Sequence, residues 1–331
     1  MRQTIVLLGL ILCGSAFAAD SQLMNLVMPD ARVLAGVNVT TAENSPLGQF
    51  LLAKLGLIGG IPQDFITATG FNPLQDVSEI LAATAADPSN FSGLVMARGN
   101  FPVDKLGGLL AGKTNWQVTT YGGATLVSST NPKQKVAHAV AFLGNSIAVA
   151  GDLASVKAAI DRSTGANSID PALALTVNQL SGSEDEWVAS ATSVGSILPS
   201  SVTLGAPATG PAAGIMPLLT SIQAFNGGVK FGDNVAITGQ LTASSPQNAT
   251  ALNAVIKLGM MLAGSAGTSK GGNPQIASAL QFLQALQVAV DGSAVNLSLS
   301  VPESQIESLV NSVPAKKPVA SLQQPELHNG N

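Results

Sequence analysis

Strict alternation of apolar and polar residues is the feature of this sequence that most constrains its fold. Every second residue is apolar in AVNLSLSV (residues 294–301), and nearly the same pattern occurs in VAITGQLTA (residues 235–243). A period of two is typical of strands with one buried face, so both segments are predicted to be strands. Their other face then carries neutral polar side chains, which form our candidate partner-binding face: Thr238, Gln240, Thr242, Asn296, Ser298 and Ser300.

Two-residue turn signals separate strands of this kind. Glycine-containing pairs occur at residues 122–123, 144–145, 232–233 and 291–292. These pairs readily adopt the positive φ that tight hairpins need, so consecutive strands are predicted to pair in antiparallel fashion.

Helices are predicted to follow several of these hairpins. Helix-start signals occur at Asp152, at Ser245-Pro246 and at Pro302-Glu303, and apolar residues at helical spacing come after each of them. A strand-strand-helix order therefore recurs along the chain. We predict an α+β fold in which repeated β-β-α units build an antiparallel sheet, with the helices packed on one face.

The first 18 residues have the order of a signal peptide, with Arg2, an apolar run and small residues that end at Ala18. We expect cleavage before Ala19 and a periplasmic or extracellular protein. The apolar run is much shorter than the roughly 20 residues of a spanning helix, so an integral membrane protein is not expected. Lipidation at Cys13 is the weaker alternative, because Leu12 rather than a small residue precedes the cysteine.

The rest of the chain is predicted to form two halves. A stretch rich in Pro, Gly and Ala indicates a linker at residues 198–214, between a first α+β half (19–197) and a second (215–313). Residues 314–331 read as a disordered Pro-rich tail. Charged residues make up only 10% of the sequence and the net charge is −4, so no basic surface for nucleic acid is expected.

Two motifs resemble sites but lack the required context. GGLLAGKT (residues 107–114) fits the phosphate-loop pattern, which must follow a strand and open a helix. Here helical spacing precedes the motif and strand alternation follows it, which predicts a glycine-ended helix and no nucleotide site. GTSKG (residues 267–271) fits the nucleophile-elbow pattern, with Ser269, Asp291 and His328 in the order of some hydrolases. Ser269 lies between two helical segments and His328 in the tail, so a serine hydrolase is the least favoured function.

Metal and cofactor sites are not expected. His138 is predicted to be an ordinary strand residue, and the sequence has only two histidines. Glu184, Asp185 and Glu186 form one acidic cluster without calcium-ligand spacing, so we interpret it as the solvated start of a strand. The helix predicted at residues 249–264 is apolar on nearly all sides, which indicates burial against the sheet or, alternatively, a groove for a lipid or a partner.

Several segments resemble uncharacterised secreted α+β proteins of soil bacteria: FNPLQDVSEILAAT (71–84), GLVMARGNF (93–101), IAVAGDLASVKAAI (147–160) and VAVDGSAVNLSLSVPE (288–303). The resemblance implies export and an α+β fold, and no functional residue. We expect a non-enzymatic secreted or periplasmic binding or structural protein, with an envelope protein or polymer as its partner. The alternative is a carrier of an apolar small molecule or lipid, which a pocket between helices and sheet would favour.

Overall fold

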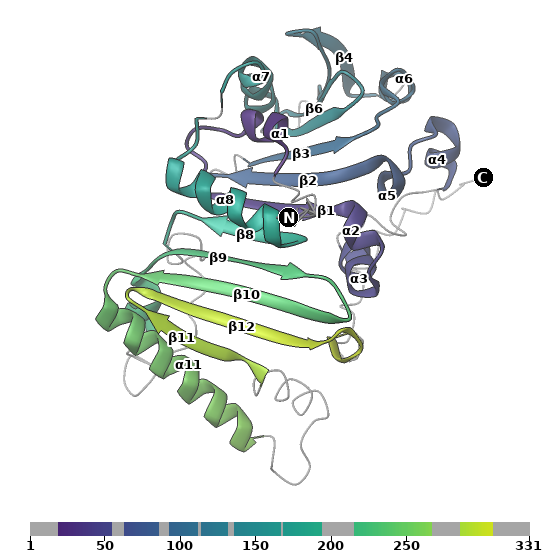
Figure 1. Cartoon of the computed structure of the whole chain (residues 1–331). Coiled ribbons are helices and arrows are strands. Elements are labelled where there is room, and N and C mark those ends of the chain that lie inside the picture. Colours follow the sequence, from purple (N-terminus) through teal and green to yellow (C-terminus); the bar gives the residue numbers. More distant parts are fainter. Residues whose placement is uncertain are drawn as a thin grey trace, which may run out of the picture.

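A computed structural model gives the structure of the chain and describes residues 19–54, 63–85, 93–111, 114–131, 136–166, 168–193, 215–266 and 285–306. The predicted signal peptide, the linker at residues 198–214 and the tail at residues 314–331 lie outside these ranges. Helices and a large antiparallel sheet make up the structure, which confirms the α+β fold class (Figure 1).

The helices are α1 (Ser21–Leu26), α2 (Val39–Glu43), α3 (Pro46–Lys54), α4 (Gln63–Thr69), α5 (Pro73–Asp76), α6 (Val103–Ala111), α7 (Leu153–Arg162), α8 (Pro171–Ser183), α10 (Ile215–Thr220) and α11 (Pro246–Ala266). The strands are β1 (Val33–Asn38), β2 (Val77–Thr84), β3 (Gly93–Gly99), β4 (Trp116–Tyr121), β5 (Ala124–Ser129), β6 (His138–Leu143), β7 (Ile147–Asp152), β8 (Glu186–Ser190), β9 (Ile222–Lys230), β10 (Asn234–Ala243), β11 (Gln287–Asp291) and β12 (Ala294–Pro302).

All the described strands join one 12-stranded sheet in the order β11-β12-β10-β9-β8-β1-β2-β3-β7-β6-β5-β4 (Figure 1). Each neighbouring pair is antiparallel, as the hairpin signals predicted. β8 pairs with β9, so the sheet is continuous between the two predicted halves of the chain.

Most of the local signals are placed as the sequence indicated. The pair at residues 232–233 does lie between β9 and β10, but neither residue has the positive φ that we expected. Gly122, Gly123, Gly144 and Gly292 have positive φ in hairpin turns, where a side chain would strain the backbone. The Asp152 carboxylate accepts a hydrogen bond from the Ser155 amide at the start of α7.

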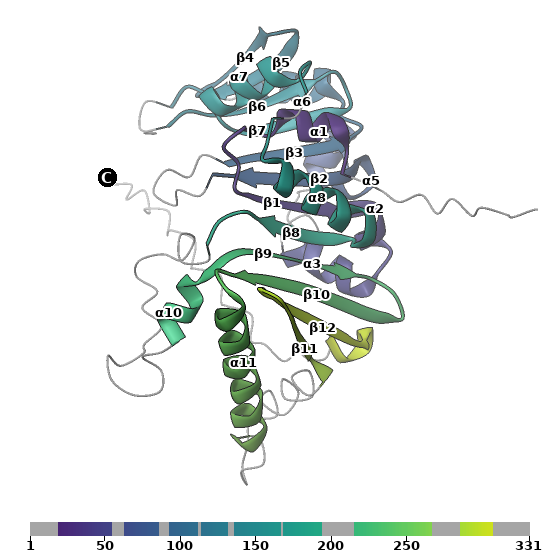
Figure 2. The same ribbon diagram turned by 60° about the vertical axis from the view of Figure 1, so that its left-hand side comes forward.

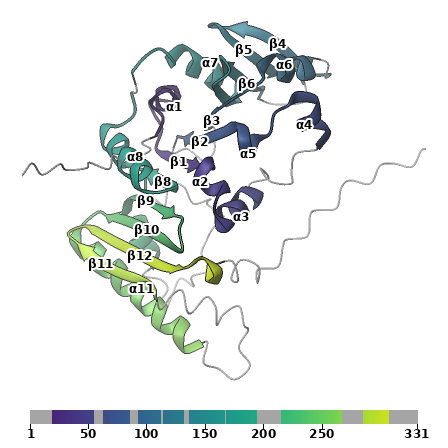
Figure 3. The ribbon, with the colours of Figure 1, turned by 45° about the vertical axis from the view of Figure 1, so that its right-hand side comes forward.

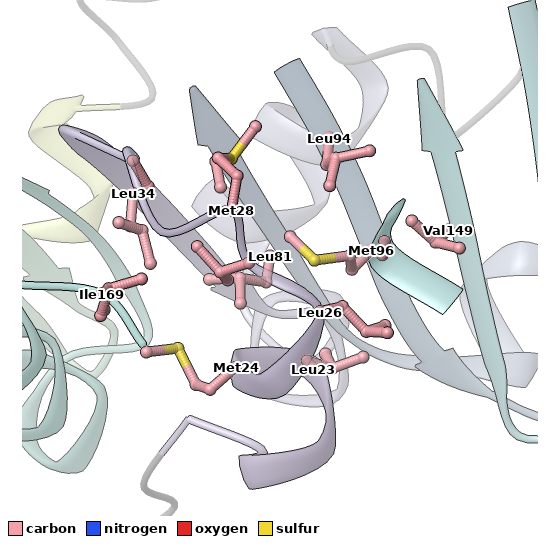
Figure 4. Packing of buried hydrophobic residues seen from close by; sticks show 14 of the residues in the cluster. Leu23, Met24, Leu26, Met28, Leu34, Leu81, Leu94, Met96, Val149 and Ile169 are labelled. Atoms are coloured by element: carbon pink, nitrogen blue, oxygen red, sulfur yellow. The ribbon is translucent and has the colours of Figure 1, made fainter. Parts of the chain in front are cut away.

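One face of the sheet, which we call the α8 face, is covered by α1, α7 and α8. Leu23 and Leu26 of α1 pack on Leu81 and Met96 in a fully buried cluster (Figure 4). α1 and α8 lie over the central strands in a second view (Figure 2). On this face the Trp187 indole occupies the space beside Gly36, where a Cβ atom would come within 2.4 Å of the ring.

The opposite face, which we call the α11 face, carries a second set of helices. α2 and α6 pack there around buried Val39, Leu106 and Phe142. α10 and the first half of α11 pack on the same face near β12, around Leu252 and Val295. The two groups lie towards different ends of the sheet (Figure 3).

This arrangement corrects the expectation of helices on a single face. Strands such as β2, with Ile80 on one side and Leu81 on the other, are apolar on both faces and need cover on both. Helices do follow β3, β7 and β10, but α6 and α11 lie on one face and α7 on the other. The recurring order of elements therefore does not correspond to one repeated packing arrangement.

A residue that follows β12 caps the N-terminus of α3, which lies much earlier in the sequence. Glu303, directly after β12, accepts hydrogen bonds from Ser45 Oγ at 2.6 Å and from the Leu47 amide at 2.8 Å. The carboxylate thus satisfies an amide in the first turn of α3.

α11 is buried only in part, contrary to one of the two interpretations of its sequence. Ala249 and Leu252 are buried, whereas Leu258 is 50% and Met261 72% exposed. The helix runs well beyond the strands on which it packs (Figure 2). Across the described ranges, we find no helix whose length and apolar character would allow it to span a membrane.

Candidate binding site

A row of small apolar residues crosses the α11 face of the sheet. Paired residues of antiparallel strands share a face, and the strand registers align the row as Ala150, Val95, Ala82, Ala35, Val188, Gly227, Gly239 and Leu297. Val95 is 50% exposed. Short side chains at these positions leave a depression between the helices on either side.

A pocket lies in this depression where β1, β8, β9 and β10 run side by side. Its volume is about 460 Å³. We call this pocket the trough, and the residues that line it on the α11 face are Ala35, Val37, Glu186, Val188, Gly227, Val229 and Ile237. Ile237 is 36% exposed at its rim. Gly227 has no side chain and five of the other six side chains are apolar, so the trough offers a hydrophobic surface of the size of a small-molecule site.

Glycines make the floor of the trough possible. A Cβ atom at Gly227 would lie 2.4 Å from the Thr238 carbonyl oxygen. At the adjacent Gly228, on the opposite face, a Cβ would meet the Glu184 side chain at 2.4 Å. Close approach of backbone and side chains at β9 therefore requires both glycines.

Glu186 is the one ionisable group of the trough. It is paired in register with Val37 and Val229, so its carboxylate stands among aliphatic side chains. Its Oε1 is buried without a hydrogen-bond partner in the described residues. Burial, and secondly the charge of Asp185, raise the pKa of Glu186 to about 7.

The acidic cluster is thus not the solvated strand start that we expected. Asp185 is only 4% exposed and accepts hydrogen bonds from Lys230 Nζ at 2.9 Å and from the Phe231 amide at 2.8 Å. Glu184 points to the α8 face, where its Oε1 accepts a hydrogen bond from Thr238 Oγ1. Glu184 is the C-cap residue of α8 and precedes β8, so strand alternation does not place it on the face of Glu186. The acidic composition of the segment did not indicate that the three carboxylates have different surroundings.

A second cavity, of about 350 Å³, lies on the α8 face between α1, α8 and the strands beneath them. We call it the N-terminal pocket, and its polar lining is Asp20, Asn38, Thr40, Thr41, Ser78, Glu79, Arg98, Ser181, Glu184 and Asp185. The guanidinium of Arg98 binds the Asp20 carboxylate through Nε at 2.8 Å. Burial raises the pKa of the Glu79 carboxyl, and the nearby Asp20 charge acts in the same direction.

The six residues of the candidate partner-binding face do come together. Thr238 is paired with Ser298, and Gln240 with Asn296, on the part of the α8 face formed by β9 to β12. Gln240 accepts a hydrogen bond from Asn226 and donates one to Asn296, so amide side chains bridge three strands. Ser298 and Ser300 are exposed, whereas Thr242 and the bridging amides are half-buried. A partner role for this face remains a prediction.

The motif-bearing segments are placed as follows. Gly107 and Gly108 lie inside α6, and β4 comes after the motif, so helix precedes strand as predicted for GGLLAGKT. Ser269 and His328 lie outside the described residues, while Asp291 ends β11 in an exposed position. His138 is an exposed residue at the start of β6. Within the residues that the structure describes, no three His, Cys, Asp or Glu side chains group as metal ligands.

Comparisons with known proteins give a similarity of fold alone. No family model matches the chain, and no curated protein matches it. The chain is similar to the solved structures of crystal forms III, I and IV of TP0453, with TM-scores of 0.49, 0.48 and 0.49 and sequence identities of 13%, 11% and 12%. The matches cover 88%, 88% and 87% of this chain and 98%, 97% and 96% of the other. No residue role is transferred from them.

Proposed function

We propose that the protein is a non-enzymatic, exported carrier that binds an amphiphile with one apolar chain in the trough. The observation that supports this most is the combination of an open apolar depression with one buried, unpartnered carboxylate oxygen at Glu186. Apolar walls with a small number of placed polar groups are typical of small-molecule sites. A carboxyl with a perturbed pKa at such a place is a further mark of a functional site.

The shape of the trough favours a chain over a compact ligand. It crosses four neighbouring strands, which at about 4.8 Å per strand gives a length of about 14 Å. An extended alkyl chain can lie along this length with one side on the sheet. Each buried methylene should contribute up to about 0.8 kcal/mol, equivalent to about a fourfold change in affinity.

The head group should be a cation or a hydrogen-bond donor. Glu186 Oε1 has no donor within the described protein, and an ammonium group of the ligand would supply one. Since the pKa of Glu186 is raised to about 7, the carboxylate is mostly ionised at pH 8 and mostly protonated at pH 6. Binding of an amine, which stays charged over this range, should therefore strengthen from pH 6 to pH 8.

Titration calorimetry of the exported chain with decylamine, dodecylamine, dodecanol and dodecanoate, each below its micelle concentration or its solubility limit, tests the proposal. We expect dodecylamine to bind more tightly than decylamine, and the amine more tightly than the alcohol or the acid at pH 8. With Glu186→Gln, the preference for amine over alcohol should disappear while the dependence on chain length remains. Equal heats for all four compounds, at the level of buffer, would refute the carrier proposal.

A matched pair of variants locates the binding surface. Val188→Asp introduces a charge on the floor of the trough, where the alkyl chain would lie. It should therefore abolish the binding of dodecylamine. Leu175→Asp makes the same kind of change at a 60% exposed position of α8, on the other face, and should leave binding unchanged. Circular dichroism of both variants checks the fold. Loss of binding in both, with the fold intact, would place the ligand elsewhere.

The polar face of β10 and β12 supports a second candidate, a module that binds an envelope protein or a neutral polymer. Its exposed Ser298 and Ser300 offer uncharged hydrogen-bonding groups on a part of the sheet that no described helix covers. The bridging amides are already bonded to one another, however, which leaves fewer free donors and acceptors for a partner. For this reason we place the trough first.

A further inference from the structure

The first two described residues of the chain are held by side chains from distant parts of the fold. The Ala19 nitrogen donates a hydrogen bond to Ser181 Oγ of α8 at 2.8 Å, and both residues are buried. The next nitrogen, of Asp20, donates to Glu79 Oε1 of β2 at 3.3 Å. Two consecutive backbone nitrogens therefore point into the N-terminal pocket.

The pocket has an excess of negative charge for a nitrogen to meet. Its lining includes the carboxylates of Asp20, Glu79, Glu184 and Asp185, against a single cation, Arg98. Asp185 is also paired with Lys230, which lies outside the lining, so Glu79 and Glu184 are the lining carboxylates for which the described residues supply no ion pair. Arg98 is engaged by Asp20 and also binds Gln22. Glu184 Oε2 is buried without a partner among the described residues. Buried carboxylates without a cation are costly, so a positive charge at this place would stabilise the fold.

We propose that the N-terminal pocket is the binding site for the protein's own α-ammonium group, created when the leader is cleaved before Ala19. The proposal rests on the expected cleavage site and on the position of the Ala19 nitrogen, and it is independent of the ligand in the trough. An amide nitrogen has one donor and no charge. A terminal ammonium has three donors and a charge, so it can keep its bond to Ser181 and bind pocket carboxylates as well.

Docking of this terminus would also order part of the main core. Asp20 caps α1 by accepting from the amides of Gln22 and Leu23. α1 then places Leu23 and Leu26, both fully buried, over β2 and β3. Removal of the leader would therefore strengthen the attachment of α1, and the processed protein should be more stable than its precursor.

The test compares two forms of the chain that begins at Ala19, one with a free and one with an enzymatically acetylated terminus. We expect acetylation to lower the midpoint of thermal unfolding by about 2–4 °C, which corresponds to the loss of one charge-assisted interaction in a protein of this size. A Gly-Ser extension before Ala19 should lower it as well, because the ammonium then leaves the pocket. A charge-independent structural role would make the extension harmful and the acetylation neutral, and that outcome overturns the proposal.

Two substitutions link the effect to the pocket. In Glu79→Gln, acetylation should change the midpoint by less than half as much as in the wild type, because one of the pocket carboxylates is gone. Gln179→Ala, at an exposed position of α8 outside the pocket lining, is the control and should leave the acetylation effect unchanged. If the effect is the same in both variants, the ammonium does not bind the pocket. N-terminal sequencing of the native protein should give Ala19 as the first residue. Any other first residue would also refute the proposal.

Discussion

Glu186 should make the stability of the ligand-free protein depend on pH in a way that one substitution removes. Well below pH 4.5, the carboxyl is protonated in both the folded and the unfolded chain, so it does not affect the free energy of unfolding. Between pH 4.5 and about 7 the unfolded chain ionises Glu186 while the folded chain keeps it protonated. The free energy of unfolding must therefore fall over this window and become level again above it.

The size of the effect follows from the raised pKa. A change from 4.5 to about 7 corresponds to about 3 kcal/mol at most, since each unit is worth about 1.4 kcal/mol. The side chain is only half-buried, and solvent screening reduces such contributions substantially, so we expect about 1–2 kcal/mol. The carboxamide of Glu186→Gln resembles the protonated acid and cannot ionise.

Urea unfolding of the wild type and of Glu186→Gln at half-unit steps from pH 4.5 to pH 8.5 measures the difference directly, because the other titrating groups are common to both proteins. The variant should nearly match the wild type at pH 4.5, where the unfolded carboxyl is only half-ionised, and exceed its stability by about 1–2 kcal/mol at pH 8. Asp291→Asn, at the exposed end of β11, is the control and should show no such divergence. Parallel curves for Glu186→Gln and the wild type would refute the assignment of a buried acid.

Three further predictions concern packing, capping and the polar face. Gly36→Ala should lower the free energy of unfolding by about 1–3 kcal/mol, because the methyl group would overlap the neighbouring indole. Gly182→Ala, a helical position with open space, should instead raise it by about 0.5–1 kcal/mol, and both are measured by urea unfolding. Glu303→Ala should cost about 1–2 kcal/mol through the lost cap of α3, and an unchanged urea midpoint would contradict this role. Ser298→Glu combined with Ser300→Glu should change stability by less than about 0.5 kcal/mol, and equal capture of cell-wall polymer by variant and wild type would remove this face as a partner site.

The sequence predicts local structure and pairing well wherever one residue pattern decides both. Alternation alone places Thr238 and Ser298 on one face, and the register pairs them directly. The turn glycines and the Asp152 cap are also found where they were expected. These features depend on the φ preferences and hydrogen bonds of a few neighbouring residues, so no knowledge of distant contacts is needed.

Other features depend on residues far apart in the chain. The trough requires Ala35, Val188 and Gly227 to be cross-strand neighbours, and the pairing of β1 with β8 that brings them together leaves no mark in either strand. The presence of helices on both faces of the sheet could have been predicted from two strand sequences. The segments EILAATA and HAVAFL are apolar at odd and even positions alike, which is typical of strands covered on both sides. Burial of Glu186 likewise follows from its neighbours in β1 and β9 rather than from its own segment.

The position of β8 in the sheet has a consequence for how the chain reaches its native state. β1 to β7 form a contiguous block whose members all precede α7, and β1 stands at its border until β8 pairs with it. A chain that is synthesised or exported from its N-terminus would therefore complete this block with the backbone groups of β1 unpaired along one side. Until its own β8 pairs with it, such a border can also accept the β8 of another copy. Strand exchange between copies at β1 is thus the characteristic misfolding risk of this topology, and β8 to β12 are the segments that remove it.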